Sequence, residues 1–147
     1  MKCIYAAAKI GEKYFFAVIG LSADQIPELP KNMLGISSAS PEELAKWYSA
    51  ADCLANPTLE DNMPMVNLEA LSCGTPIVAF DTGGCAEAIG DCGCVVPKRD
   101  TAAFCEAIRK YTDCSSEISQ KCLERARRFN AADTFAQYIN LYKELIQ

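Results

Sequence analysis

Two carboxylates, Asp61 and Glu69, stand with seven residues between them in LEDNMPMVNLEALSCGTPIVAFDTGG, the stretch that covers residues 59–84. The apolar pattern predicts a short strand at 53–57 and a helix that begins near Pro64. The first N–H groups of a helix have no partner within it, and the helix dipole is positive at that end. The start of this helix is therefore suited to a phosphate or diphosphate group.

The spacing of the two acids suggests what is attached to such a diphosphate. Glu69 lies about one and a half turns into the expected helix, where its carboxylate can accept two hydrogen bonds from a vicinal diol such as a ribose. Asp61 precedes the helix and could reach hydroxyl groups on the far side of the diphosphate. These positions fit a nucleoside-diphosphate sugar. A second interpretation stays open, in which Asp61 or Asn62 only caps a helix and Glu69 is an exposed surface residue.

The Gly83-Gly84 pair also has two interpretations. It is either a turn that needs positive φ or a backbone surface kept bare for a ligand. The sequence contains neither a Gly-x-Gly-x-x-Gly fingerprint nor a Walker A lysine motif, which argues against the common NAD and ATP sites.

The chain has 147 residues, of which 50% are hydrophobic and 22% are charged, as expected for one folded domain across 1–147. The formal net charge is -5, and the densest basic cluster consists of Arg125, Arg127 and Arg128. That cluster is interpreted as a solvated helix face, so no nucleic-acid partner is expected.

The nine cysteines are expected to be reduced thiols of a cytoplasmic protein, because their number is odd and no signal peptide precedes them. The chain has no histidine, and only Cys92 and Cys94, with Cys85 nearby, form a tight group. No metal site is therefore expected. No apolar stretch approaches membrane-spanning length, and peripheral membrane association of the full-length protein stays open.

Buried strands alternate with amphipathic helices, which predicts an α/β fold with a Rossmann-like parallel sheet of about five strands flanked by helices. Strands are expected at 14–20, 33–37, 53–57, 76–80 and 93–97. Helices are expected to end near Gly11, to follow the caps Ser40 and Asp100, and to cover 64–73, 86–89, 116–129 and 133–145.

Two segments carry a further expectation about burial. The run YFFAVIG at 14–20 is apolar throughout, which is typical of a strand buried on both faces. The final helix places Phe135, Ile139, Tyr142 and Ile146 on one face. We expect this face to pack on its own domain, with docking on a partner as the alternative.

The stretch NPTLEDNMPMVNLEALSCGTPIVAFDTGG resembles the nucleotide-sugar-binding half of retaining GT-B-fold glycosyltransferases. Asp61 matches the first acid of the family motif and Glu69 matches the second. EELAKWYSAADCLANP upstream, and GGCAEAI and GCVVP downstream, are similar to the motif's usual surroundings, so that the resemblance covers most of 33–111. The resemblance implies a fold that is one half of a GT-B fold.

The resemblance implies a role for each site residue. Glu69 resembles the acid that binds the ribose hydroxyls. Asp61 resembles the catalytic acid that contacts the donor sugar and supports the charge that develops as the glycosidic bond breaks. The other implied donor-binding residues are the sugar cradle Asn62, Met63 and Pro64, the diphosphate-facing amides of Met65 and Val66, and the base-binding loop at Ser37 and Ser38. The family needs no metal or other cofactor.

The sequence departs from the family pattern in two ways. Asp61 stands where the family usually has Glu, which puts the geometry of the sugar contact or the preferred sugar in doubt. Nothing before Tyr14 matches the strand, or the Arg and Lys, that stabilise the leaving diphosphate, and the acceptor-binding N-terminal domain is absent. The resemblance thus implies the donor half of a hexosyltransferase, inactive or weak alone, whose glycan or lipid acceptor binds through the missing domain.

Three alternatives stay open. The chain could be a non-catalytic nucleotide-binding module. It could be a subunit of a split glycosyltransferase that associates through exposed surface of the domain. It could also belong to the nucleotide-sugar epimerases of the same overall fold.

Overall fold

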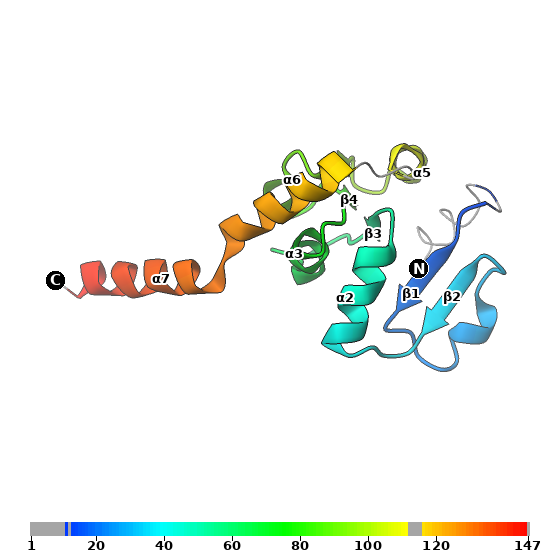
Figure 1. Cartoon of the computed structure of the whole chain (residues 1–147), viewed down its shortest axis with the longest axis horizontal. Coiled ribbons are helices and arrows are strands. Elements are labelled where there is room, and N and C mark those ends of the chain that lie inside the picture. The colour runs from blue at the N-terminus through cyan, green and yellow to red at the C-terminus, as the bar shows by residue number, and fades with distance from the viewer. Residues whose placement is uncertain (1–10, 12, 112–115, 147) are drawn as a thin grey trace.

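The computed structural model describes residues 11, 13–111 and 116–146. The described part is an α/β fold in which parallel strands are flanked by helices, as expected (Figure 1). The strands are β1 (Phe16–Ile19), β2 (Met33–Ile36), β3 (Leu54–Asn56), β4 (Ile77–Phe80) and β5 (Gly93–Val96). Each lies within a predicted range. The helix expected to end near Gly11 falls outside the described residues.

The expectation of one sheet of about five strands is wrong for the described residues. β1 pairs with β2 in one parallel sheet, and β3, β4 and β5 form a second parallel sheet in that order. β1 and β3 are not hydrogen-bonded to each other. The physical consequence is that each of these two strands has one edge beside which no strand of the described ranges lies.

The helices follow their sequence signals closely. They are α2 (Pro41–Ala50), α3 (Met65–Ser72), α4 (Cys85–Ile89), α5 (Thr101–Lys110), α6 (Ser116–Ala126) and α7 (Ala131–Leu145), with short 3-10 turns at Ile26–Glu28 and Arg127–Phe129. Ser40 and Glu43 form the reciprocal capping box that the sequence predicts. Asp100 caps α5 through a hydrogen bond from the Ala103 N–H to its Oδ1 at 2.9 Å.

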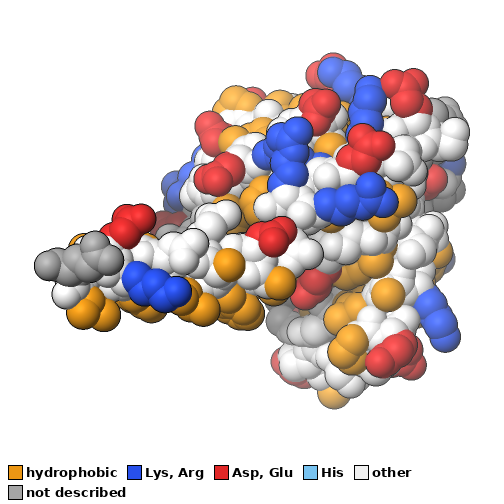
Figure 2. Space-filling view, turned by 60° about the vertical axis from the view of Figure 1, so that its left-hand side comes forward, with side chains coloured by type: hydrophobic (Ala, Val, Ile, Leu, Met, Phe, Trp, Pro, Cys, Tyr) orange, Lys and Arg blue, Asp and Glu red, His pale blue; other side chains and the backbone are white. Residues whose placement is uncertain are grey.

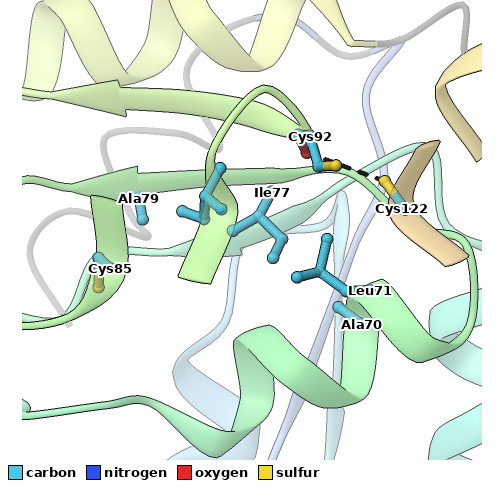
Figure 3. Close-up of a cluster of buried hydrophobic side chains, with 8 residues drawn as sticks. Ala70, Leu71, Ile77, Ala79, Cys85, Cys92 and Cys122 are labelled. Carbon is cyan, nitrogen blue, oxygen red and sulfur yellow. Dashed lines mark hydrogen bonds between the residues drawn. The ribbon is translucent and has the colours of Figure 1, made fainter. Parts of the chain in front are cut away.

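β4 lies at the centre of the core, and all four of its residues are buried. Ile77 and Ala79 pack with α3, α4 and α6, whereas Val78 and Phe80 pack with α5 (the first cluster is drawn in Figure 3). Helices therefore cover both faces of this sheet, which is why a continuous apolar segment is stable there.

Three buried cysteines belong to this core rather than to a metal site. Cys85, Cys92 and Cys122 are fully buried in the cluster of Figure 3 and act as small hydrophobic side chains. The cysteines within the described ranges are thiols, not disulfides. No group of three or more metal-ligating side chains occurs among the residues described. None of the described helices has the length and apolarity needed to cross a membrane.

The predicted burial of 14–20 is wrong. No residue of β1 is buried, and the neighbouring Phe15 is 66% exposed. The reason is the split sheet, because the part of the chain that the structure describes gives β1 a neighbouring strand on one side only. The apolar sequence of β1 is typical of a strand buried on both faces, and the described residues do not bury it in this way.

The expectation that the last helix packs on its own domain is also wrong. α7 begins at Ala131, after the cap Asn130 and two residues before the predicted start, and every described residue from Asn130 onward is exposed. The helix projects from the body of the molecule (Figure 1), and its hydrophobic side chains gather along one side of the arm (Figure 2). The extended conformation of Asn130, with ψ 127°, turns the chain away after α6.

Candidate functional site

The candidate site lies where the strands end and α3 begins. A cavity of about 1230 Å³, which we call the interstrand cavity, is lined by all residues of β1 and β3. Gly20 follows β1, Ser37 and Ser38 follow β2, and Val66 and Glu69 lie on α3; all five also line the cavity. Ligands of parallel α/β sheets bind beyond the carboxyl ends of the strands. The cavity thus brings together four of the residues predicted from the sequence, two from the loop after β2 and two from α3.

Glu69 is held by a tyrosine that sequence reasoning missed. The hydroxyl of Tyr48, on α2, donates a hydrogen bond to Oε2 of Glu69 at 3.0 Å. Burial raises the pKa of Tyr48, and the hydrogen bond to Glu69 and its charge raise that pKa further. Tyr48 therefore remains a neutral donor at physiological pH. Glu69 is exposed to solvent, and both residues line the interstrand cavity.

The start of α3 is open. The helix begins at Met65 with Pro64 as its N-cap, and no side chain caps it. This excludes the interpretation in which Asp61 or Asn62 caps this helix. The side chains of Met65 and Val66 are 63% and 40% exposed. A helix start without a side-chain cap retains unpaired N–H groups that can bind an anion.

Asp61 does not lie in the interstrand cavity. Its Oδ1 accepts a hydrogen bond from the N–H of Met63 at 3.1 Å, which closes a local turn in the exposed loop before α3. Asn56 and Val66 line the cavity, whereas no residue between them in the sequence does. The structure thus places the predicted site residues of this loop and of the helix start outside the cavity, namely Asp61, Asn62, Met63, Pro64 and Met65.

The Gly83-Gly84 pair supports the Asp61 loop. The Gly84 N–H donates to the carbonyl oxygen of Asn62 at 2.6 Å, and a Cβ at Gly84 would lie 2.7 Å from that oxygen. Gly83 has φ +47°, and a Cβ there would overlap the Asp61 carbonyl oxygen. Thr82 adds a hydrogen bond from its Oγ1 to the Leu59 carbonyl at 3.0 Å. Gly83 therefore takes the positive φ of a turn, and the bare backbone of both glycines contacts another loop of the same chain.

A buried amide pair fixes α3 against the end of β3. Asn56 Nδ2 donates to Asn67 Oδ1 at 2.8 Å, and Asn67 is fully buried. Asn67 Nδ2 in turn lies 3.6 Å from the Cys85 sulfur, and burial raises the pKa of that thiol. Buried polar groups require such partners. The signal that could have identified this pair is an Asn in the otherwise apolar first turns of α3.

The charges around the site come mostly from acids. Of the described residues that line the cavity, Lys13 is the only basic one, and it precedes β1 in the sequence. Lys98 is 3.9 Å from Glu60, next to Asp61, in an exposed ion pair. A bound diphosphate would therefore depend mainly on the N-terminus of α3 for its stabilisation.

Comparisons with known proteins agree with this architecture. The family model for glycosyl transferases group 1 matches residues 6–113. The chain is 35% identical over 109 residues to a D-inositol 3-phosphate glycosyltransferase of Corynebacterium efficiens, a match that covers 71% of this chain and 26% of the relative. It is 31% identical over 138 residues to the enzyme of that name from Corynebacterium urealyticum, which covers 86% of this chain and 32% of the relative. The chain thus spans about a quarter to a third of the length of these curated relatives.

The fold is shared with a solved GT-B structure. A sucrose-phosphate synthase from Thermosynechococcus elongatus superposes with a TM-score of 0.86 at 24% identity, over 99% of this chain and 42% of that protein. Fold and family model together show that this chain belongs to the glycosyl transferases group 1, a family of GT-B-fold glycosyltransferases.

Proposed function

We propose that this chain binds a nucleoside-diphosphate sugar as the donor-binding part of a retaining glycosyltransferase. The observation that carries the proposal is the position of Glu69. Its carboxylate is oriented by Tyr48 and lines the same cavity as Ser37 and Ser38, one turn beyond a helix start that no side chain caps. A site of this kind offers acceptors for ribose hydroxyls beside N–H groups for a diphosphate.

Each part of the donor has a proposed partner. The base lies against the loop of Ser37 and Ser38, and the ribose lies against Glu69. The diphosphate faces the amides of Met65 and Val66, where the dipole of α3 favours negative charge. The sugar extends past the helix start toward the loop of Asn62, Met63 and Pro64, and toward Asp61, because these residues lie beyond the cavity.

The proposed chemistry is the departure of a diphosphate from a sugar. The sugar gains positive charge as the glycosidic bond breaks, and the carboxylate of Asp61 stabilises that charge electrostatically. The leaving diphosphate gains negative charge, which the N-terminus of α3 stabilises. The proposal invokes no metal ion. Because the described residues that line the cavity include one basic side chain, donor binding is expected to be weak and transfer by this chain alone to be slow or absent.

A non-catalytic nucleotide-binding module is the second candidate. The position of Asp61 outside the cavity favours it, because a nucleotide held by Glu69 and the α3 amides would not need to reach Asp61. The two candidates differ in whether the sugar contributes to affinity.

Calorimetric titration with UDP, GDP, ADP and their common sugar conjugates, with and without EDTA, tests the proposal. We expect one base to bind with a dissociation constant of about 0.1 to 1 mM, equivalent to roughly -4 to -5.5 kcal/mol. Glu69→Gln should weaken binding of nucleotide and sugar conjugate alike, whereas Asp61→Asn should weaken only the sugar conjugate. Glu106→Gln is the matched control, since Glu106 is an exposed acid of α5 that forms an i,i+4 ion pair with Lys110.

Each outcome of this titration is informative. Binding that Glu69→Gln abolishes and Asp61→Asn reduces for the conjugate supports a donor site. Equal affinity for nucleotide and conjugate, unchanged in Asp61→Asn, supports the nucleotide module. Affinity for no base, or affinity that Glu69→Gln leaves intact, contradicts both. Transfer activity of the isolated chain well above background would contradict the expectation that it is incomplete as an enzyme.

A further inference from the structure

The fold separates the cysteines that stand together in the sequence. Cys92 and Cys94 have one residue between them, but Cys92 belongs to the cluster of Figure 3 and Cys94 packs against the cluster on the opposite face of β4. The cysteine that Cys92 meets is Cys122, which lies 30 positions further along the chain, on α6. The fold thus brings together two thiols that no local spacing indicates.

The thiols of Cys92 and Cys122 are in contact. The Cys122 S–H donates to the Cys92 carbonyl oxygen, with 3.9 Å between the sulfur and that oxygen. The two sulfur atoms point toward one another in Figure 3. Burial raises the pKa of the Cys92 thiol, as does the Asp91 carboxylate, whereas a hydrogen bond with the Cys122 thiol lowers that pKa. A cysteine in contact with both the backbone and the thiol of another has the proximity that a disulfide requires.

Hydrogen bonds anchor the backbone on both sides of this contact. The N–H of Cys92 donates to the Ile89 carbonyl oxygen at 3.0 Å, which fixes the connection between α4 and β5. On α6, one turn after Cys122, Arg125 Nε donates to the Ala88 carbonyl oxygen at 3.2 Å. The two thiols therefore face one another at a place where α6 is held against the end of α4.

The pair lies close below the surface. Both cysteines are fully buried, yet Asp91 and Lys121, their neighbours in the sequence, are exposed. The Cys92 sulfur lies 3.8 Å from Oδ1 of Asp91. A small displacement of α6 thus admits a molecule of the size of water to the sulfur atoms.

We propose that Cys92 and Cys122 form an oxidisable dithiol, which hydrogen peroxide converts into a disulfide that ties α6 to the start of β5. The Cys92 thiolate attacks one peroxide oxygen and breaks the O–O bond, which gives a sulfenic acid and a hydroxide that takes up the proton of the thiol to form water. The Cys122 sulfur then attacks the Cys92 sulfur, and the S–O bond breaks to release a second water. Two thiols are oxidised to one disulfide, and one peroxide is reduced to two waters.

The disulfide acts as a lock on α6. It closes a loop of 30 positions, which restricts the unfolded chain and should raise the thermal midpoint by about 5–10 °C. Thiols such as glutathione reverse the reaction by exchange. The lock concerns the packing of α6 on the sheet and does not rest on the proposed donor site.

The test is mass spectrometry of the chain after treatment with hydrogen peroxide at about pH 8.5, where more of each thiol is ionised. The remaining thiols are alkylated with iodoacetamide, and the chain is digested without reduction. We expect a peptide pair that links Cys92 to Cys122 and is two hydrogens lighter than the two thiol peptides together. Scanning calorimetry of the same sample measures the midpoint, and dithiothreitol should restore both the thiols and the original midpoint.

Three alanine variants give matched comparisons. Cys92→Ala and Cys122→Ala should each abolish the linked peptide and the rise in midpoint on oxidation. Cys94→Ala should retain both, because Cys94 packs on the opposite face of the sheet. The peptide map of the wild-type chain decides the linkage even if a variant does not fold.

The result expected is the Cys92–Cys122 link, a higher midpoint after oxidation, and loss of both in either variant of the pair. Recovery of Cys92 and Cys122 in alkylated form, from a chain whose other thiols are oxidised, would overturn the proposal. A link from Cys92 to Cys94 would overturn it too, since the fold holds these two on opposite faces. An oxidised midpoint that does not rise, or a rise that persists in Cys122→Ala, would show that the disulfide does not lock α6.

Discussion

The hydroxyl of Tyr48 donates a hydrogen bond to Glu69 across 21 positions of sequence and from one helix to the next. The bond fixes one carboxylate oxygen of Glu69 at 3.0 Å from the Tyr48 hydroxyl on α2, while Glu69 remains exposed at the interstrand cavity. Tyr48 thus acts on a ligand through Glu69, as a positioning residue.

Tyr48→Phe is therefore expected to weaken nucleotide binding without abolishing it. Loss of one hydrogen bond that orients the carboxylate should cost about 1 kcal/mol, or roughly fivefold in affinity. Calorimetry on the variant measures this directly. Tyr142→Phe is the control, because Tyr142 lies on the exposed α7. Equal affinities for the wild-type chain and Tyr48→Phe would show that Glu69 needs no such orientation.

Tyr48 is also expected to lower the free energy of unfolding at alkaline pH. Burial and the hydrogen bond to Glu69 raise the pKa of Tyr48 in the folded chain above the usual tyrosine value of about 10. Above about pH 10 the unfolded chain loses this proton and the folded chain retains it, so the free energy of unfolding falls as pH rises. Urea unfolding between about pH 8 and 11 should show this decline, with a smaller slope in Tyr48→Phe. An identical slope in the variant would assign the decline to other groups.

Gly83 supports a prediction about the Asp61 loop. Alanine at Gly83 would be strained at φ +47° and would overlap the Asp61 carbonyl. We expect a loss of about 1–2 kcal/mol from the backbone and about 1–3 kcal/mol from the overlap, measured by urea unfolding. Gly20→Ala separates the two effects, because Gly20 has φ +91° but a Cβ there would meet no atom within 4 Å. Equal losses in both variants would mean that the contact with the Asp61 loop contributes nothing.

Local signals predicted the elements well. The capping box at Ser40 and the cap at Asp100 involve residues three positions apart, and both occur in the structure. The buried strand at β4 was also predicted correctly. A similar apolar run at β1 was not, because burial depends on whether distant segments supply a neighbouring strand.

The site was predictable only in part, for the same reason. Ser37, Ser38, Val66 and Glu69 were identified from a motif and from their place after the strands, and they line one cavity. The hydroxyl that holds Glu69 comes from another helix, and no spacing within the motif indicates it. The role of the two glycines could not be decided from the sequence, since either a loop or a ligand can require a bare backbone.

The projecting helix α7 gives the last prediction. All of its described residues are exposed, including Phe135 at 65% and Leu145 at 73%, so it contributes little to the stability of the body. A chain that ends at Phe129 should unfold within about 3 °C of the full chain, equivalent to about 1 kcal/mol for a domain of this size. Differential scanning calorimetry measures both midpoints. A drop well beyond this value would show that α7 packs on the body in solution, as the sequence pattern alone suggested, whereas an unchanged midpoint leaves its apolar face available to a surface outside this chain.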